Sequence, residues 1–213
     1  MKNVSKFLPA ILILVFMAGC SSQPKPATEA KPAEEKKTAA EPTYITGRDA
    51  LQKMYIAARS WAPDAKPYNI VSLASKNNPG KDGKSGIWFA GFASPSKRSS
   101  KIYTWSGIEA EGAPDLGVSF KPEDEWSPAN STTQIFDLNF LKTDSDNAFK
   151  EAQEHGGDKL MKKSPDTLVL YKLDWNAREN QLIWHVLYGA NRDNPQLRIA
   201  VDATGGKYIR VER

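Results

Sequence analysis

The side chains that most often carry out chemistry are scarce in this sequence. It contains two histidines, His155 and His185, and a single cysteine, Cys20. One cysteine excludes an internal disulfide and any metal site built from several thiolates. No Gly-x-Ser-x-Gly motif accompanies the histidines, and no spacing singles out an acid–base pair among the carboxylates. His185 lies among apolar residues of a predicted strand, where a hydrogen-bonded packing role is typical, so we predict no catalytic residue.

Two short polar segments have some features of ligand-binding loops. Residues 80–85 read Gly-Lys-Asp-Gly-Lys-Ser, but a phosphate-binding loop needs glycine at position 78, where this chain has Asn78, and it must lead into a helix. The first positions of a calcium-binding loop are matched by Asp144, Asp146 and Asn147. The segment lacks the central glycine and the final glutamate of that pattern. Capping of a helix explains these three residues. The sequence therefore predicts no nucleotide, metal or cofactor site.

The first nineteen residues have the pattern of an export signal. Lys2 and Lys6 precede an apolar run at residues 8–17, and the small residues Ala18 and Gly19 follow it. The run is shorter than the roughly 20 residues that a membrane-spanning helix needs. A positive start, a short apolar centre and a small-residue exit predict a cleaved secretory signal over residues 1–19.

The end of this segment, Met17-Ala18-Gly19-Cys20, resembles the lipobox of bacterial lipoproteins. The resemblance implies cleavage before Cys20, lipidation of its thiol and acylation, as with palmitate, of the new amino end. Several acyl chains hold a protein stably on a bilayer. Ser21 stands where Asp would favour the inner membrane, so we expect an outer-membrane anchor facing the periplasm if the source is Gram-negative. An ordinary signal peptide that contains a cysteine is the alternative.

Residues 20–42 predict a lipidated cysteine followed by a disordered tether. Positions 21–42 contain four Pro, five Ala, four Lys and four Glu, with no aromatic or branched aliphatic side chain. Such a segment cannot bury apolar surface. The formal net charge of +4 includes Lys2 and Lys6 of the signal, and the charges of the tether cancel. The small remaining excess gives no basic patch, so we predict no nucleic-acid partner.

Residues 43–213 predict an α+β fold with an internal repeat. Apolar residues at helical spacing follow Thr46, a candidate N-cap, and strands are expected over 68–75, 87–93 and 101–105. A second helix is expected to begin at Asp144 or Ser145, before strands over 167–174, 181–188, 197–202 and 208–211. Matching pairs lie 96 to 98 residues apart: Ala50-Leu51 with Ala148-Phe149, Ile87-Trp88 with Ile183-Trp184, Phe92 with Tyr188, and Ile102 with Ile199.

We interpret these matches as two tandem units in which a helix packs on an antiparallel sheet. The first covers residues 43–105 and the second covers residues 144–213. Residues 106–143 connect them and have strand character at 116–120 and 134–141. Duplication is one explanation, and chance alignment of two generic helix-and-sheet units is the other.

The second unit resembles the PepSY-type domains of exported bacterial proteins. The matching segments are 144–148 at the helix start, 183–186 in the middle strand and 201–207 in the closing hairpin, where Gly205 stands in place of the usual threonine. The resemblance implies a PepSY-like or cystatin-like shape and a role in binding or modulation, with peptidase inhibition proposed for some members. It carries over no catalytic residue.

Three tryptophans, Trp105, Trp126 and Trp175, fall at predicted strand ends or in loops. Such positions suit a recognition groove, although peripheral core packing is the alternative. We therefore expect a lipid-anchored, periplasm-facing protein that binds or modulates a peptide, a protein or a cell-wall component without catalysis. The ligand would lie on the open sheet face or at a sheet edge. The alternatives are a structural accessory of an envelope assembly and a carboxylate-dependent hydrolase.

Overall fold

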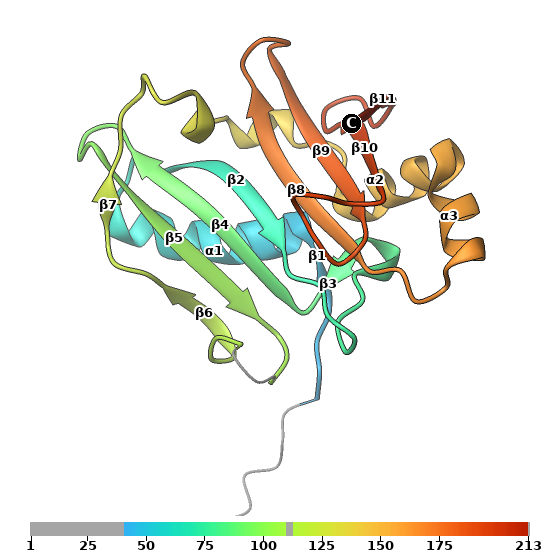
Figure 1. Cartoon of the computed structure of the whole chain (residues 1–213). Coiled ribbons are helices and arrows are strands. Elements are labelled where there is room, and N and C mark those ends of the chain that lie inside the picture. Colours follow the sequence, from blue (N-terminus) through green and yellow to red (C-terminus); the bar gives the residue numbers. More distant parts are fainter. Residues whose placement is uncertain (1–40, 110–112, 213) are drawn as a thin grey trace, which may run out of the picture. The chain divides into compact units, whose positions relative to one another are not determined.

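The computed structural model describes residues 41–109 and 113–212 (Figure 1). The predicted signal, Cys20 and residues 21–40 of the predicted tether lie outside the described residues. The described residues form one compact unit.

The unit is built on a single antiparallel sheet of nine strands. The strand order is β11-β10-β9-β8-β2-β4-β5-β6, and the short strand β7 pairs with one end of β5. The strands are β2 (Lys66–Ser72), β4 (Ile87–Ser94), β5 (Ser99–Ser106), β6 (Gly117–Phe120), β7 (Asp124–Glu125), β8 (Val169–Asn176), β9 (Gln181–Tyr188), β10 (Leu197–Asp202) and β11 (Tyr208–Glu212). A separate two-stranded ladder joins β1 (Ile45–Thr46) to β3 (Lys84–Ser85). The α+β prediction with extensive antiparallel pairing is confirmed.

The helices pack on one face of this sheet, which we call the helix face; the other is the open face (Figure 1). Helix α1 (Gly47–Trp61) lies against β2, β4 and β5, while α2 (Ser145–Ala152) lies against β9 and β10. A π-helical turn (Gln153–Gly157) continues α2 into α3 (Asp158–Lys163). Three short 3-10 turns complete the secondary structure: Lys81–Gly83, Ser131–Thr133 and Leu138–Phe140.

Helix α1 follows the predicted apolar rhythm, because Ala50, Leu51, Met54 and Ala58 are buried against the sheet. Thr46 is its N-cap, as expected, but its side chain makes no capping hydrogen bond. The partners come from the start of α2 instead.

The backbone N–H of Gly47 donates to Ser145 Oγ at 2.8 Å, and that of Arg48 donates to Asp144 Oδ1 at 2.9 Å. Asp144 also caps its own helix by accepting from the N–H of Ser145. The two helix starts therefore meet near the middle of the sheet.

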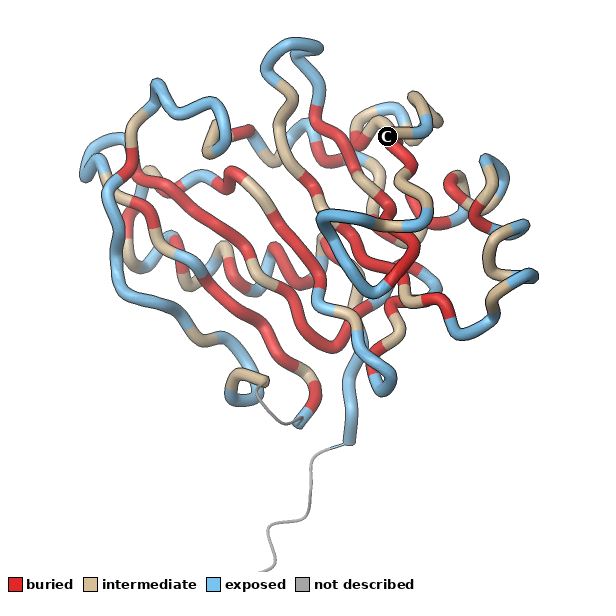
Figure 2. The backbone as a smooth tube through the Cα atoms, viewed as in Figure 1, coloured by how far each residue is buried: buried red, intermediate tan, exposed pale blue. Residues whose placement is uncertain are grey.

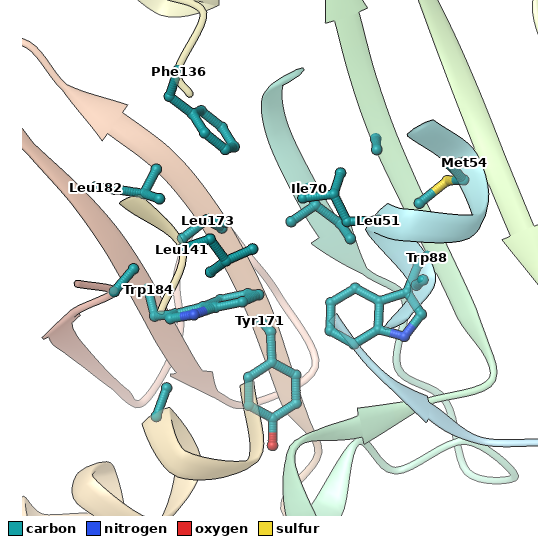
Figure 3. Packing of buried hydrophobic residues seen from close by; sticks show 14 of the residues in the cluster. Leu51, Met54, Ile70, Trp88, Phe136, Leu141, Tyr171, Leu173, Leu182 and Trp184 are labelled. Carbon is teal, nitrogen blue, oxygen red and sulfur yellow. The ribbon is translucent and has the colours of Figure 1, made fainter. Parts of the chain in front are cut away.

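Two fully buried indoles form the centre of the core, Trp88 on β4 and Trp184 on β9. Their rings meet edge to face with centroids 6.5 Å apart, and Tyr171 lies beside them (Figure 3). Each indole N–H donates to a backbone carbonyl just before a helix: Trp88 to Ile45 at 3.1 Å and Trp184 to Thr143 at 2.9 Å. Figure 2 shows that buried residues run along the central strands. The hydrogen bonds to the two backbone carbonyls explain how the polar indole N–H groups are accommodated in an apolar interior.

The segment 106–143 differs in part from its predicted structure. Strand β6 confirms the expected strand at 116–120, but residues 134–141 form a turn rather than a strand. The Asp137 side chain accepts from the N–H of Asn139 at 2.9 Å, which bends the backbone at the point where alternation alone predicted extension. Phe136 is buried there, and its N–H donates to the Pro67 carbonyl.

Candidate functional site

The three tryptophans singled out in the sequence do not share one groove. Trp105 is buried in the main core, and Trp126 is buried in a separate cluster with Tyr68 and Ala93. Trp175 is half-buried and packs on Phe140, with ring centroids 5.2 Å apart. The Trp126 indole N–H is already bonded to the Thr133 carbonyl. Packing accounts for all three rings, and their role in binding stays a prediction.

The two ends of the sheet differ in how they meet solvent. Strand β11 carries Arg210 and Glu212, whose charges protect an edge from pairing with another chain. Strand β6 is Gly-Val-Ser-Phe and contains no charged residue. Among the described residues, no strand pairs with the outer side of β6. Figure 2 shows an exposed run along this margin of the sheet.

Large apolar side chains are exposed on β6 and just before it. Leu116 is 41% exposed, Val118 is 39% exposed and Phe120 is 64% exposed. Side chains two residues apart share a face of a strand, so Val118 and Phe120 form one row, and Leu116 lies at the bend that precedes it. The register places Val118 opposite Trp105 and Phe120 opposite Tyr103, which puts this row on the helix face.

The same residues direct their backbone groups outward. The N–H of Lys121 donates inward to the Ile102 carbonyl at 2.9 Å. In an antiparallel ladder the hydrogen-bonding direction alternates along the strand. Ser119 and Gly117 therefore bond inward with β5, while Val118 and Phe120 present their N–H and C=O groups to the outer side. We call Leu116, Val118 and Phe120, with these outward backbone groups, the β6 edge.

Cations and aromatic rings gather beside the β6 edge. The Lys101 ammonium lies 4.5 Å from the centre of the Phe120 ring and 5.5 Å from that of Trp61. Lys97 lies in the turn between β4 and β5, and its ammonium is 5.3 Å from the centre of the Trp61 ring. Glu123 accepts from the Trp61 indole N–H at 2.7 Å, and this hydrogen bond is the main reason that its pKa is lowered. The edge is thus apolar with positive charge close to it.

A second cluster lies on the open face of β8, β9 and β11 and is centred on His185. Its Nδ1 lies 2.6 Å from Glu212 Oε2, and its Nε2 lies 3.0 Å from Asp174 Oδ1. Lys172 pairs with Asp174 at 2.5 Å, and Arg210 pairs with Glu212 at 3.0 Å. These charged side chains form a continuous chain of ion pairs across three strands.

The environment of His185 fixes its charge. Burial by itself would lower the pKa of His185, but hydrogen bonds to Asp174 and Glu212 outweigh it and the pKa is raised. Burial would raise the pKa of each carboxyl group, and the bond to His185 instead holds both below their ordinary values. Both ring nitrogens face carboxylates, so the imidazolium form satisfies both contacts. This arrangement ties β11 to the sheet and leaves neither nitrogen free to act as a base in this state.

The sequence predicted that His185 is hydrogen-bonded, and this is confirmed. Its partners were missed because Asp174 and Glu212 are distant in sequence and become neighbours only through the register of β8, β9, β10 and β11. Within residues 41–109 and 113–212, no three His, Cys, Asp or Glu side chains are arranged to hold a metal ion. None of the helices in that part of the chain is long and apolar enough to cross a membrane.

Comparison with known proteins gives one similar fold. No family model matches the sequence, and no curated protein matches it. A crystal structure of a protein from Clostridium difficile 630, described as a "putative lipoprotein", matches with a TM-score of 0.51 and 13% sequence identity. The match covers 76% of this chain and 91% of that chain. At this identity the similarity establishes a shared fold alone.

Proposed function

We propose that this protein is a lipid-anchored envelope protein that binds an extended polypeptide segment along the β6 edge without catalysis. The observation that carries the proposal is the coincidence of outward backbone groups with the exposed side chains of Leu116, Val118 and Phe120. An added strand would satisfy the backbone groups by hydrogen bonding, and its alternate side chains would cover the apolar row. The other end of the sheet is less suited because β11 is charged.

Two observations support the lipid anchor. Met17-Ala18-Gly19-Cys20 resembles a lipobox, and the protein of similar fold from Clostridium difficile 630 is itself described as a "putative lipoprotein". Lipidation of Cys20 would hold the domain at the membrane through residues 21–42. With Ser21 after the cysteine, a Gram-negative source would place it on the outer membrane, facing the periplasm.

We also infer that the domain combines two related helix-and-sheet units in one sheet. From the central pair β2 and β8 the strands run outward in matching order: β4 and β9, then β5 and β10, then β6 and β11. Trp88 and Trp184 occupy matching places, and each bonds the carbonyl two residues before its helix. This symmetry supports a repeated unit, which we propose to be PepSY-like or cystatin-like.

The binding proposal is tested with a soluble peptide of alternating valine and threonine, added to the full chain in detergent micelles. Hydrogen exchange measured by mass spectrometry should show new protection at residues 116–121, because the outward amides of Val118 and Phe120 become bonded. Phe120→Lys should weaken binding, since it places a charge in the apolar row. Ser119→Lys is the matched control, because its side chain lies on the opposite face. Protection elsewhere, or equal binding by both variants, would contradict the proposal.

A further inference from the structure

Lys101 occupies an unusual position for a lysine. Its side chain is only 13% exposed, and its ammonium lies between the rings of Phe120 and Trp61. The nearest carboxylate oxygen is Glu123 Oε1 at 3.9 Å, which is beyond hydrogen-bond length. An ammonium held beside two aromatic rings, with no carboxylate at hydrogen-bond length, can take an anionic partner from a bound segment.

Glu123 cannot easily move closer to serve Lys101. Its Oε1 accepts from the Trp61 indole N–H at 2.7 Å, and its Oε2 accepts from Ser99 Oγ at 3.1 Å. Both oxygens are therefore held by other donors. Among the described residues, no acceptor lies within hydrogen-bond distance of the Lys101 ammonium. The N–H donors of the Lys101 ammonium are therefore available to an acceptor that arrives at the β6 edge.

We infer that Lys101 selects an acidic side chain in the segment bound at the β6 edge; this inference rests on the proposed function. Lys101 belongs to β5, one strand inside the edge, and its ammonium lies over the ring of the outward residue Phe120. A strand added outside β6 would lie about 4.8 Å farther out, with alternate side chains on the same helix face. A glutamate or aspartate beside Phe120 reaches the ammonium and supplies the missing acceptor.

The chemistry favours a carboxylate over other groups at this position. A charge-assisted hydrogen bond to a partly buried ammonium is stronger than a bond to a neutral amide. The Lys97 ammonium, which lies over the other ring of the cluster, adds positive potential without occupying the place beside Phe120. The partner class is therefore an extended peptide with alternating apolar residues and at least one acidic residue on the face toward Lys101.

The test uses two synthetic peptides of alternating valine and threonine that differ in one central residue, glutamate or glutamine. Titration calorimetry with the full chain in detergent micelles should show at least about tenfold tighter binding of the glutamate peptide at low salt. The preference should shrink in high salt. Lys101→Met should remove the preference while it retains affinity for the glutamine peptide, and Lys101→Arg should restore it.

Lys121→Met provides the matched control. It removes one positive charge close to Phe120, but Lys121 lines a cavity of about 250 Å³ with Tyr68 and Val71 on the open face. The preference should survive in this variant. If Lys101→Met does not fold, as circular dichroism would reveal, the peptide comparison and its salt dependence in the wild type still test the inference.

The outcomes separate this inference from the function on which it rests. If neither peptide binds, the proposed function is wrong. If both bind equally, the β6 edge is a peptide site but Lys101 selects no acid. If the glutamate preference persists in Lys101→Met, another cation is responsible and the inference fails. A concentration-dependent dimer that Phe120→Lys abolishes would assign the edge to a second copy of this chain and overturn it.

Discussion

Replacement of His185 by leucine should destabilise the fold by an amount that depends on pH. The side chains of His185, Asp174 and Glu212 are 16%, 25% and 14% exposed. Removal of the central cation leaves two carboxylates close together and partly desolvated. Breaking a fully buried pair costs about 3–5 kcal/mol. Partial exposure reduces this cost, so we expect about 2–3 kcal/mol near pH 6.

The pH dependence follows from the direction of each pKa shift. The pKa of His185 is raised above its ordinary value of 6.5, so its stabilisation is complete below pH 6.5 and is lost as pH rises through the folded value. The pKa values of Asp174 and Glu212 are lowered from 3.8 and 4.5, so their stabilisation is present above those values and is lost as pH falls through the folded ones. The difference between wild type and His185→Leu should therefore be largest between pH 4.5 and 6.5.

Urea unfolding followed by tryptophan fluorescence measures this difference at several pH values. It should shrink as pH rises through the raised pKa of His185, where the wild-type histidine also loses its charge. A variant that adds Asp174→Asn and Glu212→Gln to His185→Leu should recover much of the lost stability, because it removes two partly desolvated carboxylates that have lost their shared cation. A cost that stays constant across this range, or an unchanged unfolding midpoint at pH 6, would refute the assigned role of the network.

Two further predictions concern the core and the anchor. Trp184→Phe should cost about 1–3 kcal/mol because it leaves the buried carbonyl of Thr143 without its donor, whereas Trp184→Ala should cost about 3–5 kcal/mol through the additional cavity; equal urea midpoints for wild type and Trp184→Phe would contradict the assigned hydrogen bond. Cys20→Ala should abolish the lipid mass seen by intact-protein mass spectrometry and release the chain from membranes, and membrane retention of the variant would argue against a lipid anchor.

Much of the secondary structure was predictable because its signals are local. Helix α1 places an apolar residue every three or four positions, and this spacing is visible within fifteen residues. The alternation around Trp184 identified a strand with Leu182, Trp184 and Val186 on one face in the same way, although the structure buries Ile183 and Leu187 on the other face as well. Residue type and position predicted either Asp144 or Ser145 as the cap of the second helix, and the structure shows that it is Asp144. Residues 134–141 misled the same reasoning. The Asp137 side chain accepts a hydrogen bond from the Asn139 N–H and so bends a segment whose alternation resembled a strand.

The candidate site depended on information that no short segment contains. The sequence suggested a sheet edge as a binding place, but only the strand order shows that the uncharged β6 and the charged β11 are the ends of the sheet. Lys101 and Phe120 meet because β5 and β6 pair in one register. A shift of one residue would turn Phe120 to the opposite face.

The sequence by itself determined where the main helices and most of the long strands form, which side chains of α1 are buried and which N-terminal segment resembles a lipoprotein signal. Only the tertiary structure decided that β2 pairs with β8, that α2 supplies the cap of α1, and that His185 lies between two carboxylates. The physical reason is range. Periodicity and capping act over a few residues, whereas strand pairing joins residues about a hundred positions apart through contacts that exist only after the chain has folded.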